Sequence, residues 1–247
     1  MNNYINILYG IDLDTEMFKS AKEALMGSYD KQTMVDTLEY LQRKGCHDVV
    51  IRLCLSLFAD KKIDGEYMNI LSEQLLRHFP YEKWEEYADS LKSILRNSGV
   101  FFEREQLLKM ADTLEMLYAK GIYNIRGLIV MCYDFLSAAN TSFSMLNATN
   151  VRIRSARIAY SSSRYNVNDA VNELRAIKNL IKKAEIGGLK QIVDYYIGIC
   201  IVALPPRYSE GVQRIIKSKH KGYPLAQLFI KYIDFHSETS KEPLELA

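Results

Sequence analysis

Arginines and tyrosines alternate along residues 151–165, and basic residues continue on the segment that follows. The candidate binding residues are Arg152, Arg154, Arg157, Tyr160, Arg164, Tyr165, Arg175, Lys178, Lys182 and Lys183. Arginine beside tyrosine on an irregular segment is a composition that contacts phosphates and stacks nucleic-acid bases. It equally suits an acidic protein surface, because forked arginine–carboxylate pairing does not depend on which molecule carries the anion.

A third interpretation needs no ligand. These basic residues would then be a solvated helix face, with some arginines paired to acids of the N-terminal half. The charge distribution permits all three interpretations. Residues 1–150 carry 16 Lys and Arg against 21 Asp and Glu, whereas residues 151–247 carry 16 against 9, so the net charge of +2 conceals two halves of opposite sign. Such an asymmetry bears on partners rather than on fold.

Signatures of catalysis are absent from the sequence. It contains no GxxxxGK[ST] phosphate loop, no GxGxxG, no HExxH and no GxSxG. The four histidines are scattered, and the four cysteines form no CxxC pair or zinc-type spacing. Cys46 and His47 are adjacent, but neighbouring residues of a helix or turn point in different directions. We therefore expect no enzyme, no catalytic residue, no metal and no cofactor, although an active site without a known motif stays open.

Apolar residues recur at the spacing of one helix face along almost the whole chain, and strand-like alternation is nearly absent. Glycines and prolines separate the periodic segments. The pattern predicts helices near residues 14–26, 32–44, 49–59, 66–78, 82–97, 103–120, 123–139, 168–186, 188–203, 208–219 and 223–236. On the helix from 168, Ala170, Leu174, Ile177 and Ile181 form the predicted buried face, opposite a basic stripe.

Short connections between helices of this length favour antiparallel neighbours. We therefore predict an all-α fold of stacked antiparallel helical hairpins, α-solenoid-like, with room for two subdomains. A self-comparison agrees, since residues 34–45 and 110–121 are identical at eight of twelve positions and both end in Lys-Gly. If the two segments are equivalent, Gly45 and Gly121 both close helices in the left-handed conformation.

Two turn regions near the C-terminus, Lys183 to Gln191 and Lys221 to Gln227 followed by Tyr232, carry glycines and small residues beside glutamine. They resemble the turns of Sel1-like and tetratricopeptide repeats. This resemblance covers about 60 residues, and it implies a solenoid that binds peptides or proteins along a concave face. No complete repeat is present, so no binding residue is carried over.

We expect three regions: an acidic helical-hairpin region at 1–140, an irregular connection rich in Ser and Asn at 141–167, and a basic helical-hairpin region at 168–247. Within the connection, residues 151–160 form either a short helix or an extended arm. The start lacks a secretory pattern, and the longest apolar run is about half of what a membrane span needs, so we expect a cytoplasmic protein without a membrane segment.

Together these features predict a non-catalytic protein–protein interaction module: an adaptor, chaperone-like or inhibitory protein that occupies a partner's surface. The alternative is a nucleic-acid-binding protein that uses the basic region 151–190.

Overall fold

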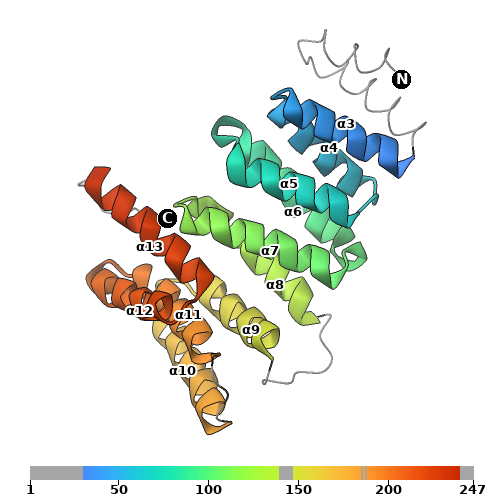
Figure 1. Ribbon diagram of the computed structural model, residues 1–247. Coiled ribbons are helices and arrows are strands. Elements are labelled where there is room, and N and C mark those ends of the chain that lie inside the picture. The colour runs from blue at the N-terminus through green and yellow to red at the C-terminus, as the bar shows by residue number, and fades with distance from the viewer. Residues whose placement is uncertain (1–29, 139–146, 185, 187, 240–247) are drawn as a thin grey trace. The chain divides into compact units, whose positions relative to one another are not determined.

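Helices account for the regular structure in the part of the chain that can be described. A computed structural model describes residues 30–138, 147–184, 186 and 188–239, and these ranges contain no strand. The all-α prediction is confirmed for them (Figure 1). The helix expected at residues 14–26 lies outside the described residues.

Apart from the helix at Ala148–Ser161, the observed α-helices lie within a few residues of the predicted positions. The α-helices are α3 (Lys31–Arg43), α4 (His47–Ala59), α5 (Gly65–Arg77), α6 (Trp84–Ser98), α7 (Arg104–Ala119), α8 (Arg126–Ala138), α9 (Ala148–Ser161), α10 (Val167–Lys183), α11 (Lys190–Val202), α12 (Tyr208–His220) and α13 (Pro224–Thr239). Short 3-10 helices are η1 (Tyr81–Lys83), η2 (Gly99–Phe101), η3 (Tyr123–Ile125) and η4 (Pro205–Arg207).

The chain divides into two compact units, and the division differs from the expected one. One unit extends to Ser90 and the other starts at Leu91, so the boundary falls within α6 rather than at 141–167. Much of that supposed connection is α9, while its residues 141–146 lie outside the described part of the chain. The helix was missed because several of its buried side chains are small, among them Ser155, Ala156 and Ala159. Such residues add little to the periodic pattern of large apolar side chains from which helices are predicted.

Within the first unit, α3 packs on α4, and both pack on α5. The core of this unit is formed by aliphatic residues together with Phe58 and Trp84, which are almost fully buried. The buried residues of α4 lie on nearly all of its sides. Asp30 caps α3 by accepting a hydrogen bond from the Thr33 amide at 2.9 Å, and Asp64 caps α5 through the Glu66 amide at 2.8 Å.

The two repeated segments end their helices in the same way. Gly45 after α3 and Gly121 after α7 have φ angles of 79° and 95°, as predicted. Beyond each glycine, the next amide donates to a carbonyl five residues back: Cys46 to Leu41 at 3.0 Å and Ile122 to Leu117 at 3.1 Å. This is the hydrogen bonding of a glycine-terminated helix, and it satisfies carbonyls that the helix leaves unpaired.

In the second unit, successive helices from α7 to α13 pack against one another, and α9 also packs on α11. Helix α13 returns to contact α7, the first complete α-helix of this unit. Helices α11 and α12 approach each other closely, since a Cβ on Gly198 would lie 3.0 Å from the Gly211 carbonyl oxygen. Only glycine at these two positions lets the backbones approach so closely.

Candidate binding surface

The candidate residues lie on α9, on the turn that follows it and on α10. Asn147 caps α9, and residues 162–166 turn the chain into α10. The predicted core face of α10 is confirmed, since Ala170, Leu174, Ile177 and Ile181 are all buried. The opposite face of α10 is exposed, and it carries much of the predicted basic stripe.

Arg152 does not belong to this surface, and its assignment there is corrected. Its guanidinium forms ion pairs with Asp112 and with Glu115, the latter at 2.5 Å, and its side chain is 20% exposed whereas that of Glu115 is fully buried. The Tyr196 hydroxyl donates to the other Glu115 oxygen at 2.8 Å. Burial alone would lower the pKa of Arg152, but Glu115 and Tyr196 hold it above its usual value. Arg152 is therefore a structural cation joining α7, α9 and α11.

Tyr160 is likewise corrected, because it is buried rather than available for stacking on a base. Its ring packs edge-on against Tyr118 at a centroid distance of 5.2 Å and against Tyr196 at 6.2 Å. Burial raises the pKa of the Tyr160 hydroxyl well above its usual value. Two tyrosines that alternate with arginines in sequence thus lie in opposite environments, since Tyr165 is fully exposed.

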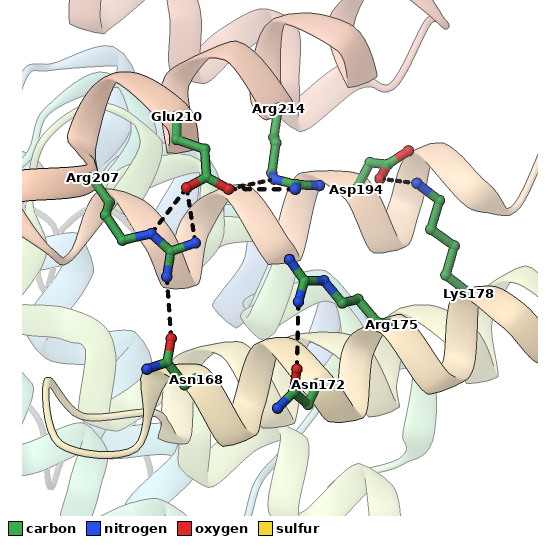
Figure 2. A network of polar contacts seen from close by, with 8 residues as sticks. All are labelled: Asn168, Asn172, Arg175, Lys178, Asp194, Arg207, Glu210 and Arg214. Atoms are coloured by element: carbon green, nitrogen blue, oxygen red, sulfur yellow. Dashed lines mark hydrogen bonds and ion pairs between the residues drawn. The ribbon is translucent and has the colours of Figure 1, made fainter.

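Part of the stripe on α10 is engaged within the protein. Figure 2 shows Lys178 reaching Asp194 of α11, a carboxylate that is 9% exposed. The guanidinium of Arg175 donates to the Asn172 side chain at 3.4 Å, on the same helix face. Beside them, Arg207 donates to Glu210 at 2.8 Å, which ties η4 to α12. Lys178 therefore serves the packing of α10 on α11, whereas Arg175 keeps an exposed charge.

The remaining candidates are exposed. Arg157 pairs with Asp134 of α8 at 2.6 Å, but both side chains are about half exposed, so the pair stays open to solvent. Such pairs contribute little to stability and leave the guanidinium available to a competing anion. The exposed set consists of Arg154, Arg157, Arg164, Tyr165, Arg175, Lys182 and Lys183. We call it the α9–α10 basic surface.

Two hollows include residues of the turn between α9 and α10. The first, of about 580 Å³, lies along the α9–α10 groove. Arg154 and Arg157 line it together with Asp169 and Glu173, so its charged groups are of both signs. The exposed acids of α10 therefore interrupt the basic surface. The positive net charge of the segment does not reveal this mixture of signs.

The second hollow, of about 750 Å³, shares Ser161 and Ser162 with the first. Its lining residues are Arg126, Gly127, Val130, Tyr160, Ser161, Ser162, Ser163, Arg164, Tyr165 and Ala203. Arg126 comes from α8, in the region that the sequence marks as acidic. No sequence pattern connects it to the turn, which begins 36 residues later. Sequence reasoning missed this residue because only the packing of α8 on α9 brings it there.

Groups that could support other chemistry are placed unfavourably. Cys132 and Cys200 are buried, and burial raises the pKa of their thiols to about 12 and about 11. Thiols so hard to ionise are poor nucleophiles at neutral pH. Across the described residues, no group of three or more His, Cys, Asp or Glu is placed to hold a metal ion. No helix in that part of the chain combines the length and apolarity that crossing a membrane requires.

Comparisons with protein-family models, curated proteins and solved structures find no match to the chain. The site must therefore be interpreted from its own geometry and charge.

Proposed function

We propose that the protein is a non-catalytic interaction module that binds an acidic protein surface through the α9–α10 basic surface. The observation that carries the proposal is the pair Arg164–Tyr165, both exposed at the tip of the turn, with Tyr165 fully so. Arginine and tyrosine are enriched among the residues that dominate binding energy at protein interfaces. A fully exposed tyrosine contributes nothing to the packing of its own chain.

The acids within the surface favour a protein partner over nucleic acid. Asp134, Asp169 and Glu173 stand among the exposed arginines, where they would repel a continuous phosphate backbone. A protein partner instead offers separate carboxylates and cations that such a mixed surface can match. In keeping with this role we place the protein in the cytoplasm, where its four free cysteines, three of them buried, would stay reduced.

The test is affinity capture from cell extract with the full-length chain, followed by mass spectrometry. We expect one specific partner with an acidic surface to be retained at moderate salt. The variant Arg175→Glu/Lys182→Glu/Lys183→Glu should lose it, because it reverses three exposed charges on α10.

A matched control reverses three exposed charges elsewhere. Arg43→Glu/Lys44→Glu/Lys62→Glu also changes the end of a helix but leaves α9 and α10 intact, so the partner should be retained. Equal capture by both triple variants would reject the proposal. Loss of the captured material on nuclease treatment, with affinity falling steeply as salt rises, would establish the nucleic-acid alternative instead.

A further inference from the structure

The hollow beside the Arg164–Tyr165 turn has the charge of an anion site. Two of its lining residues, Arg126 and Arg164, are cationic and none is acidic. The hollow along the α9–α10 groove differs, because Asp169 and Glu173 there offset two arginines. We call the acid-free hollow the Arg126–Arg164 hollow.

Arg126 is held in place by carbonyl oxygens rather than by a carboxylate. Its Nε donates to the Tyr160 carbonyl at 2.7 Å, and one terminal nitrogen donates to the carbonyls of Ala159 and Ser162. Among the described residues it forms no ion pair, although it is only partly exposed. A fixed, partly desolvated guanidinium without a counter-ion attracts an anion more strongly than a solvated one does.

The rest of the hollow is suited to an apolar group. Val130 and Ala203 contribute aliphatic surface, and Tyr165 lies at the exposed turn. Gly127 of α8 leaves space, since a Cβ built there would meet nothing within 4 Å. The hollow thus combines two guanidinium groups with aliphatic walls, and this combination fits an acidic residue that is followed or preceded by an apolar one.

We infer that the Arg126–Arg164 hollow binds an acidic peptide segment of the partner, with an Asp or Glu side chain between the two arginines and a neighbouring apolar side chain against Val130 and Ala203. The inference rests on the proposed function, which it deepens by naming what the surface recognises. A nucleic acid fits less well, because the hollow offers only two cations and the acids beside it oppose an extended phosphate chain.

The experiment selects peptides from a displayed random library on the full-length protein. An enriched peptide is then synthesised with an amidated C-terminus, and its affinity is measured by fluorescence polarisation. We expect enriched sequences to place Asp or Glu next to an apolar residue. Replacing that acid by its amide should weaken binding by about tenfold or more, since a hydrogen-bonded charge pair is lost.

Two protein variants test the hollow itself. Gly127→Leu fills it without removing a charge, and leucine favours a helix more than glycine does, so the fold should be retained. Arg164→Glu reverses its exposed cation. Both variants should lower the affinity for the peptide by about tenfold or more. The matched control is Gly65→Leu, at another exposed helical glycine with nothing within 4 Å, which should bind normally.

Several results would overturn the inference. These are enriched peptides without acidic residues, no enrichment at all, binding only with a free C-terminal carboxylate, or full binding by Gly127→Leu. A single-stranded oligonucleotide that binds and is lost in Arg164→Glu would favour nucleic acid instead. If the peptide experiments fail while the α10 triple variant still loses the captured partner, the hollow is not the peptide site. The proposed function would then be retained.

Discussion

One largely buried arginine, Arg152, joins three helices of the second unit. Its partners Asp112 and Glu115 belong to the second copy of the repeated segment, and their counterparts in the first copy, Asp36 and Glu39, are exposed. The same residue types therefore have different roles in the two copies. Burial makes the difference, because an unpaired charge inside a protein is costly.

Removing Arg152 should be strongly destabilising. In Arg152→Met, Glu115 stays buried without its partner, and we expect the free energy of unfolding in urea to fall by about 3–5 kcal/mol. Arg157→Met, which breaks an exposed pair, should cost under about 1 kcal/mol. Adding Glu115→Gln to Arg152→Met should restore part of the loss. Equal effects of the two single variants would show that the buried ion pair does not stabilise the unit.

A pair of stacked histidines gives a prediction about pH. The rings of His47 and His78 lie parallel, with centroids 3.5 Å apart, and His47 Nδ1 lies 2.8 Å from the Gln74 side-chain oxygen. Desolvation and the neighbouring His47 lower the pKa of His78. A lowered pKa means that the fold favours neutral His78, so its stabilising contribution is present above the ordinary pKa and is lost as the pH falls.

Proton NMR titration would measure this directly. We expect the His78 midpoint to lie below the ordinary histidine value and to rise in His47→Gln, which removes the neighbouring charge. Desolvation remains in that variant, so the shift should be only partly reversed. An unchanged midpoint would show that His47 does not influence His78.

At the scale of elements, the ends of helices follow a shared local rule. Helices α3, α7 and α12 each end in Lys-Gly with the glycine at positive φ. After α4 the same position is occupied by Lys61, at a φ of 60°, and the Lys62 amide donates to the Leu57 carbonyl at 2.8 Å. A non-glycine residue there carries a conformational cost that glycine avoids.

Opposite effects are therefore expected from two kinds of substitution. Gly45→Ala and Gly121→Ala should each lower the free energy of unfolding by about 1 kcal/mol or more. Lys61→Gly should raise it, by up to about 1 kcal/mol. Thermal and urea unfolding would measure all three. A loss of stability in Lys61→Gly would mean that the contacts of the lysine outweigh its backbone strain.

At the scale of the whole molecule, the two compact units provide separate reporters of unfolding. The chain has one tryptophan, Trp84, which is buried in the first unit. The tight crossing of α11 on α12 lies in the second unit, where a Cβ on Gly198 would come within 2.5 Å of Ile215 Cγ1. The substitution Gly198→Ala therefore perturbs the second unit, while the fluorescence of Trp84 reports on the first.

We expect Gly198→Ala to destabilise the second unit by about 1–3 kcal/mol through overpacking. Circular dichroism should then show an earlier urea transition, whereas the Trp84 fluorescence midpoint should stay where it is in the wild type. If both signals shift together, the units unfold as one cooperative structure despite their separate cores.

The sequence by itself determined the helices other than α9, most of their ends and the buried face of α10. These depend on local features, namely apolar spacing, capping residues and glycine at positive φ, which act within a few residues of the chain. The tertiary structure alone decided which arginines are available. Arg152 and Arg164 are similar in sequence context, yet packing buries one beside Glu115 and leaves the other exposed. The same packing brought Arg126 to the candidate hollow, where carbonyl oxygens of α9 hold it. Ion pairs and hydrogen bonds between residues far apart in sequence have no local signature.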